Sequence, residues 1–350
     1  MAYLEGAASG PAERPRDGAS LLILLAALLV LGGLASAAIG AVPVAPSAIA
    51  GALGFGPAVD PVTRAIVLEL RLPRITLAAL VGAALAAAGT VFQGIFRNPL
   101  ADPYIIGVSG GAALGATTAI VFGWTAAVAG ISAVTLAAFV AALLVTGLVY
   151  RLAWIRGEVA VEPLLLAGVA VGAFLAAVIS ALQLFGGQSL QQVIFWLMGG
   201  FSGRTWRHVA LILPYVAAGY AVARIFARDL NLLVLGDEAA RALGVDAGRR
   251  RALLIGAATL MAAAAVSVSG LIGFVGLVVP HLLRLVVGPD HRRLLPAAAL
   301  GGAVTLLLAD TVARSAAAPA EIPVGIVTAA LGAPFFLFLL RRHRRRTFWI

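Results

Sequence analysis

Ten apolar segments follow one another along the 350-residue chain. A helix of about 20 apolar residues crosses a hydrocarbon core of roughly 30 Å. Lipid offers the backbone no hydrogen-bond partners, so each segment must pair its own polar groups, which favours helices. A β-barrel would show alternating strands of about ten residues, and these continuous Ala- and Leu-rich segments exclude it. The predicted spans are 20–42, 73–94, 104–123, 126–150, 163–185, 208–227, 251–269, 271–288, 294–313 and 322–340.

The composition agrees with a membrane protein and excludes several kinds of chemistry. Hydrophobic residues make up 62% of the chain and charged residues 11%, against about 25% charged in soluble domains. Cysteine is absent, and all 25 basic residues are arginine. Without lysine the chain cannot carry a Walker-A phosphate loop or a Schiff base. The net charge of +10 fits cytoplasmic loops better than nucleic-acid binding.

The distribution of arginine predicts the orientation of the chain. With the N-terminus inside, 19 of the 25 arginines fall on the inner side and 6 on the outer side, as the positive-inside rule requires. The stretch 251–288 has no strong polar break. We divide it at Ser267–Gly270, because 38 residues are too many for one span and a single span would place the basic segment 341–346 outside.

The chain is predicted to form one membrane domain between two tails. Residues 1–19 are read as a disordered cytoplasmic tail, 20–341 as the ten-span domain and 342–350 as a basic cytoplasmic tail. The first apolar run could be a signal peptide, but its length and the spans that follow favour an uncleaved helix. A weak likeness between 82–88 and 256–262, in spans that run in opposite directions, suggests an inverted repeat of five plus five spans.

Two sequence features suggest close helix packing and an irregular backbone. Small residues recur every fourth position at Gly107, Gly111 and Gly115, a pattern that lets helix backbones approach closely. The segment 97–103 contains two prolines, which interrupt a helix. The segment is either a plain tight turn or a constriction at the cytoplasmic mouth of a pathway.

Three arginines on the predicted outer side break the positive-inside trend. Arg71 and Arg74 lie at the mouth of the second span, and Arg314 at the outer end of the ninth. They are either interfacial anchors or a docking surface for an acidic partner, since arginine pairs well with carboxylates.

The longest inner loop, 228–250, is predicted to contain a short helix. Gly236, Asp237 and Glu238 open it and Gly244 closes it, which are helix boundary signals. Its apolar residues would either dock another protein or rest on lipid headgroups.

Ionisable residues are scarce within the predicted spans. The acids nearest to them, Glu69, Asp102, Glu162, Asp310 and Glu321, lie at span ends, and His281 has no second ligand at metal-binding spacing. No catalytic constellation is legible, which disfavours an intramembrane enzyme. A secondary transporter, which usually keeps acids or histidines in its spans, is also less favoured.

Several motifs together make the family recognisable. The chain resembles, from about 65 to 341, the permease subunits of binding-protein-dependent ABC importers for iron–siderophore complexes, haem and cobalamin. The motifs are 71–74 (RLPR), 94–111 (GIFRNPLADPYIIGVSGG), 196–200 (WLMGG), 235–244 (LGDEAARALG), 273–281 (GFVGLVVPH), 309–314 (ADTVAR), 321–325 (EIPVG) and 332–334 (GAP).

The resemblance implies a type II importer permease with ten spans and both termini in the cytoplasm. It implies a homodimer in the inner membrane, two ATPase subunits beneath it that hold ATP and Mg, and a periplasmic or lipid-anchored binding protein outside. This chain would then bind no cofactor or metal of its own. Arg71, Arg74 and Arg314 would receive the acidic residues of the binding protein, and Asn98, Pro99 and Leu100 would form the cytoplasmic gate. The ATPase coupling helix would comprise Gly236, Asp237, Glu238, Ala239, Arg241, Leu243 and Gly244.

The cargo expected from the sequence is an iron chelate, ferric siderophore before haem, with cobalamin as the alternative. Haem would often invite a His, Met, Tyr or Cys ligand, and the spans offer no convincing one. A pathway that holds its cargo loosely does not need such a ligand, so haem stays open.

Overall fold

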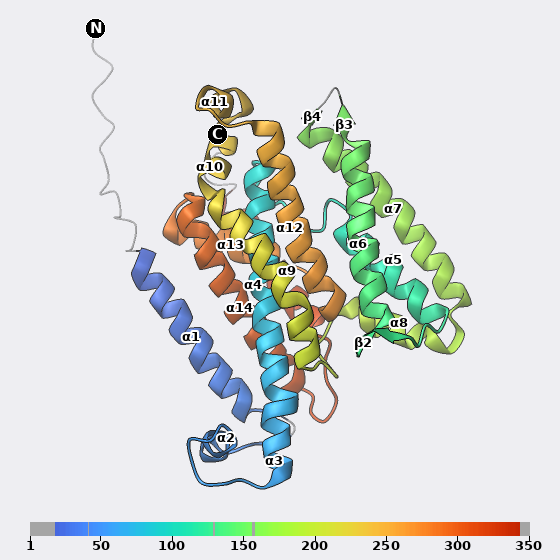
Figure 1. The fold of residues 1–350 in the computed structure, drawn as a ribbon, viewed down its shortest axis with the longest axis vertical. Helices are drawn as coiled ribbons and strands as arrows, with labels where there is room; N and C mark the ends of the chain where they lie inside the picture. The colour runs from blue at the N-terminus through green and yellow to red at the C-terminus, as the bar shows by residue number, and fades with distance from the viewer. Residues whose placement is uncertain (1–17, 41, 129, 156–157, 344–350) are drawn as a thin grey trace.

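The computed structural model describes residues 18–40, 42–128, 130–155 and 158–343, and shows a bundle of helices with two small hairpins (Figure 1). Residues 1–17 and 344–350, which make up most of the two predicted tails, lie outside the described part. The helices of the first half are α1 (Gly18–Ala38), α2 (Pro46–Ala52), α3 (Pro61–Ala65), the π-helix η1 (Ile66–Arg71), α4 (Leu72–Ile95), α5 (Val108–Val121), α6 (Ala133–Leu152) and α7 (Val161–Phe185).

The second half is helical throughout. Its elements are the 3₁₀ turn η2 (Gly187–Ser189), α8 (Leu190–Met198), α9 (Trp206–Ile225), α10 (Ala227–Leu235), α11 (Asp237–Ala242), α12 (Ala247–Ser269), α13 (Val275–Val287), α14 (His291–Ser315) and α15 (Val324–His343). Two antiparallel hairpins connect the helices around α6: β1 (Ala127–Val128) with β2 (Ile131–Ser132), and β3 (Trp154–Ile155) with β4 (Glu158–Val159).

The helices match the predicted apolar segments, although three of them are short. In the described part of the chain, seven helices are long and apolar enough to cross a membrane. One of these is the continuous helix Pro61–Ile95, which joins α3, η1 and α4 and extends outward beyond the predicted start at residue 73. Three shorter apolar helices, Val108–Val121, Val275–Val287 and Val324–Phe338, fall in the remaining predicted segments. The chain is therefore a multi-pass membrane protein, while the count of ten crossings and the inverted repeat stay predictions.

The two short helices α5 and α13 each follow a break in the helical backbone. The predicted division of 251–288 is confirmed, because α12 ends at Ser269 and α13 begins at Val275. The break between α4 and α5 runs from 96 to 107, and the Tyr104 hydroxyl in it donates to the Ile272 carbonyl at 2.9 Å. Irregular backbone within a membrane is tolerated where protein buries it, and here the Tyr104 hydroxyl brings the two breaks into contact.

Small residues bring the central helices into backbone contact. A Cβ at Gly89 would lie 1.8 Å from the carbonyl oxygen of Gly276, and one at Gly82 would lie 2.2 Å from that of Gly302. Helix α4 thus packs directly on α13 and α14, while the predicted ridge on α5 presses Gly115 against the Ala137 carbonyl of α6. Such close approach replaces the hydrophobic driving force that helices lack in lipid.

The charged residues separate toward the two ends of the bundle. One end, called the inner end here, carries α10 and α11 (Figure 1). The opposite end, called the outer end, carries α2 and α3. Helix α1 begins near Arg293, at the inner end. Helices α2 and α3 occupy the segment 43–64, for which the sequence suggested no structure.

Candidate functional site

An arginine cluster at the outer end surrounds one fully buried carboxylate. Arg74, on α4, donates through Nε and a terminal nitrogen to Asp310 on α14, at 2.8 to 3.1 Å. Its other terminal nitrogen donates to Glu321 at 2.8 Å. The Asp310 side chain is 0% exposed and that of Arg74 is 13% exposed. Arg74 therefore joins α4, α14 and the segment before α15.

Arg71 and Arg314 face inward and bind the end of α1. Arg71 donates to the carbonyls of Ala37, Ala38 and Val42. Arg314 donates to the carbonyl and hydroxyl of Ser36. Both side chains are buried in the described structure. The predicted docking role of these arginines stays a prediction, and the structure adds a second role, which is to hold α1 and its following loop on the bundle.

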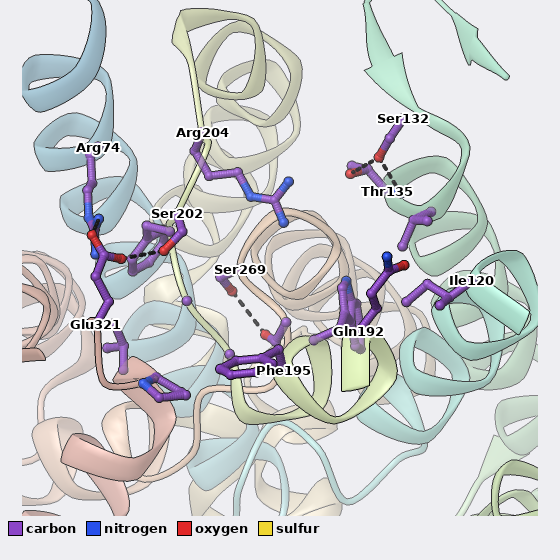
Figure 2. Close-up of a pocket in the computed structure, with 18 of the residues that line it drawn as sticks. Arg74, Ile120, Ser132, Thr135, Gln192, Phe195, Ser202, Arg204, Ser269 and Glu321 are labelled. Carbon is purple, nitrogen blue, oxygen red and sulfur yellow. Dashed lines mark hydrogen bonds and ion pairs between the residues drawn. The ribbon is translucent and has the colours of Figure 1, made fainter. Parts of the chain in front are cut away.

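A cavity of about 540 Å³ with polar and apolar walls opens beside the cluster, as Figure 2 shows. A second cavity of about 490 Å³ adjoins it and shares Arg74, Phe201, Ser202, Arg204 and Glu321. The first cavity lies between α4, α5, α6, α8 and the starts of the loops that follow α8 and α12. Its polar lining residues are Arg74, Ser132, Thr135, Gln192, Ser202, Arg204, Ser269 and Glu321.

Two charged groups at the cavity lie in loops and have shifted pKa values. Burial opposes ionisation of Glu321, but hydrogen bonds from Arg74 and Ser202 outweigh it, so the pKa of this carboxyl is lowered. Burial lowers the pKa of Arg204, in the loop between α8 and α9. Arg204 therefore adds a positive group to an outer end whose two carboxylates at the cluster, Asp310 and Glu321, already contact Arg74.

The inner end is organised around Asp237, the first residue of α11. Its carboxylate accepts two hydrogen bonds of 2.6 Å from Arg251 on α12, and one of 2.8 Å from Arg97 after α4. Arg97 also donates to the Leu233 carbonyl of α10 at 3.0 Å. Burial opposes ionisation of Asp237, but the two arginines outweigh it and the pKa of this carboxyl is lowered. One carboxylate therefore ties α11 to the ends of α4 and α12.

The segment predicted as a gate follows directly on Arg97. Asn98 and Pro99 are exposed and Leu100 is half-buried at the inner end. The Asn98 side chain accepts from the Leu100 backbone N–H at 2.9 Å, closing a local turn. Arg97 has a positive φ of 49°, a backbone conformation that non-glycine residues seldom adopt. The segment is therefore a tight turn in this structure, and its gating role stays a prediction.

The predicted short helix in the inner loop is confirmed as α11, preceded by α10, which the sequence did not suggest. Gly236 has a φ of 122° and Gly244 a φ of 82°, so both boundaries require glycine. Glu238, Arg241, Ala242 and Leu243 are exposed, Ala239 is half-buried and Ala240 is buried. The exposed face suits a docking role, which no contact in the structure tests.

Sequence reasoning missed the partners in both clusters. Asp310 and Glu321 were noted only as acids at span ends, and Arg251 only as one of the inner arginines. Nothing local marks them, because their partners lie 236, 247 and 14 positions away in the chain. Arg204 is one of the six arginines on the predicted outer side, and nothing in the sequence distinguishes it from the others.

The fold is that of a multi-span membrane permease, and comparison with known proteins shows its family. The model of the FecCD transport family matches residues 28–342. The chain belongs to this family, whose members are the membrane subunits of ABC importers and work with a separate ATPase and a substrate-binding partner.

Individual relatives differ in the cargo for which they are named. A cobalamin import system permease of Halobacterium salinarum is 49% identical over 304 residues, which cover 87% of this chain and 80% of the relative. A hemin transport system permease of Yersinia pestis is 45% identical over 286 residues, covering 80% and 84%. The solved structure of a metal-chelate type ABC transporter, in an inward-facing conformation, has a TM-score of 0.82 and 36% identity, and covers 93% of this chain and 99% of that one.

Proposed function

We propose that this chain forms a homodimer in the inner membrane and imports an iron chelate, driven by two ATPase subunits and supplied by an external binding protein. The observation that carries the proposal is the family match over 28–342, together with a fold shared with a metal-chelate transporter. Relatives named for hemin and for cobalamin support a cargo among large metal-centred chelates.

The exposed apolar surface of the chain supports a dimer. Helix α7 exposes Leu166, Val169 and Phe174, and an apolar cavity of about 490 Å³ lies between α13, α14 and α15. Lipid can cover part of this surface. In the proposed assembly a second copy covers the rest, and the pathway runs between the two.

The two clusters suggest how transport is driven. The loaded binding protein docks with acidic residues at Arg71, Arg74 and Arg314, which requires the two buried arginines to exchange backbone carbonyls for its carboxylates. ATP binding closes the ATPase pair, which pushes on residues 236–244. Asp237 passes this movement to Arg97 and Arg251, and so to the segment Asn98–Leu100, where the cargo leaves.

Cobalamin is the second candidate, because a relative 49% identical to this chain is named for it. The same assembly and mechanism would serve it. A secondary transporter stays the less favoured alternative, since it would need neither an ATPase nor a binding protein.

Uptake in proteoliposomes tests the proposal. The permease is reconstituted with its ATPase and binding protein and offered labelled ferric siderophore, haem and cobalamin, with ATP or with a non-hydrolysable analogue. We expect accumulation of an iron chelate with ATP only, and its loss when Arg71 and Arg74 are replaced by Glu. Accumulation of cobalamin alone would select the second candidate, and uptake without the ATPase would overturn both.

A further inference from the structure

Arg204 is a charged side chain in the outer cavity that has no carboxylate partner among the residues that the structure describes. It lies in the loop between α8 and α9 and lines both outer cavities. Figure 2 shows its guanidinium projecting into the space toward Thr135 and Gln192, away from the Ser202–Glu321 pair. Its Nε is buried and has no hydrogen-bond acceptor among the described residues.

The neighbouring histidine does not satisfy the guanidinium. A terminal nitrogen of Arg204 lies 3.4 Å from Nε2 of His208. The other ring nitrogen, Nδ1, accepts from the Thr205 backbone N–H at 3.2 Å, as part of a capping box at the start of α9. A neutral imidazole that accepts at Nδ1 carries its proton on Nε2. In this tautomer two N–H groups face each other, and in either tautomer the neutral ring supplies no counter-charge to Arg204.

The other arginines of the outer cluster differ from Arg204 because oxygen atoms accept from their terminal nitrogens, although Nε of Arg314, like that of Arg204, has no acceptor among the described residues. Arg74 is paired with Asp310 and Glu321, and Arg71 and Arg314 bind oxygens at the end of α1. Taking a charge out of water without a partner is unfavourable. A fold that holds one such guanidinium at the wall of a cavity has left room for an anion.

The rest of the cavity indicates what kind of anion fits. A guanidinium presents two parallel N–H groups that match the two oxygens of a carboxylate. Hydroxyls of Ser132 and Thr135 and the amide of Gln192 lie on the opposite wall, and Phe195 and Trp196 add aromatic surface. The volume of about 540 Å³ lies in the range of small-molecule sites.

We propose that Arg204 binds a carboxylate of the transported chelate as it enters the outer cavity. This inference rests on the proposed import function and adds to it a residue that selects cargo by charge. An acidic side chain of the binding protein is the competing occupant. The inward direction of the guanidinium favours the cargo, because a docking protein reaches the rim of the cavity first.

The test compares haem with its dimethyl ester, which has the same frame without the carboxylates. Both are offered to the reconstituted permease–ATPase complex with the same binding protein, and uptake is measured for the unmodified chain and for Arg204→Gln. We expect the variant to take up haem about tenfold more slowly, the loss of one charge-assisted hydrogen-bonded pair, and to take up the ester almost unchanged. The binding protein is the same for the unmodified chain and for the variant. Its own preference between haem and the ester therefore cancels when the variant's uptake of each compound is divided by that of the unmodified chain.

Two control variants separate this effect from a general change in charge or fold. Arg207→Gln removes an exposed arginine three positions away and is expected to leave the ratio of haem to ester unchanged. Arg204→Lys keeps the charge without the planar pair of donors and is expected to recover part of the haem uptake. An equal loss for haem and ester, or an equal effect of Arg207→Gln, would overturn the proposal.

Two binding measurements complete the test without relying on transport. Titration of the detergent-solubilised permease–ATPase complex with haem and with the ester is expected to show tighter binding of haem, and Arg204→Gln is expected to remove the difference. If haem does not bind more tightly than the ester, or if Arg204→Gln keeps the difference, the role of Arg204 is contradicted even where uptake works. Failure of haem uptake with the difference intact contradicts haem as the transported cargo and leaves the role of Arg204 standing. Weaker docking of the binding protein to Arg204→Gln would assign the residue to that protein instead.

Discussion

The outer and inner ends of the molecule both use arginine–carboxylate contacts, but they use them in different surroundings. At the outer end Asp310 is 0% exposed and Arg74 13%, and the other two arginines are paired mainly with backbone and hydroxyl oxygens. At the inner end the side chains of Asp237 and Arg97 are 32% and 44% exposed, and only Arg251 is buried. Buried pairs are costly to break, whereas exposed pairs contribute little and exchange easily.

This difference fits the tasks that we propose for the two ends. The outer cluster fixes α1, α4 and α14 relative to one another, so it can present a defined surface. The inner cluster joins three helix ends through one half-exposed carboxylate, so it can follow a movement of α11 without unfolding the bundle. Substitutions at each end test this difference.

The largest effect is expected from removing the buried carboxylate. Asp310→Asn keeps the shape of the side chain but removes the buried charge that faces both Arg74 and Arg314, and leaves Arg74 with the partly exposed Glu321. We expect a loss of about 3–5 kcal/mol in the free energy of unfolding, measured by thermal or denaturant unfolding of the detergent-solubilised protein. Glu321→Gln, at a side chain 39% exposed, is the matched variant and is expected to cost about 1 kcal/mol or less. Equal losses for the two would mean that burial does not distinguish them.

An intermediate effect is expected at the inner end, on transport more than on stability. Arg251→Gln removes the two 2.6 Å hydrogen bonds to Asp237 and frees α11 from α12. We expect uptake per ATP hydrolysed to fall roughly tenfold, the size of one charge-assisted contact, while ATP hydrolysis continues. The control is Arg249→Gln, which removes a side chain that is 90% exposed on the same helix. A similar fall for Arg249→Gln would show that the charge near α11 matters and the contact with Asp237 does not.

The smallest effect concerns pH at the same carboxylate. The pKa of Asp237 is lowered in the folded protein, so folding favours its ionised form. Its contribution to stability is therefore fully present above the ordinary carboxyl value of 3.8, and is lost as the pH falls through the lower folded value. We expect the difference in midpoint temperature between the unmodified chain and Asp237→Asn to shrink as the pH is lowered from 6 toward 3. A difference that grows on acidification would reverse the sign and refute the assignment.

Much of the fold can be predicted from the sequence because the membrane imposes it. Apolar length alone placed the long helices to within a few residues, with two exceptions. The helix that contains α4 extends outward beyond its predicted start, and α6 begins at Ala133 rather than at 126. The break before α13 followed from span length, and the helix at α11 from its acids and glycines. The two helices α2 and α3 did not follow, because they are short and lie outside the apolar pattern.

The candidate site divides in the same way. Residue type and position identified Arg71, Arg74, Arg314 and the segment Asp237–Ala242 as unusual. They did not show that Arg71 and Arg314 bind the end of α1, or that Asp310 is the partner of Arg74. Those contacts join positions far apart in the chain, and no local pattern records them.

The sequence by itself determined that the chain lies in a membrane and which segments form its long helices. It also identified unusual residues at the two ends of the bundle. A backbone in lipid must pair within its own segment, so composition and length are sufficient for that. Only the tertiary structure decided which charges neutralise one another and which, like Arg204, are left facing a cavity. Charge pairing depends on distances of a few ångströms between helices, and packing of small residues at contacts such as Gly89 with Gly276 sets those distances.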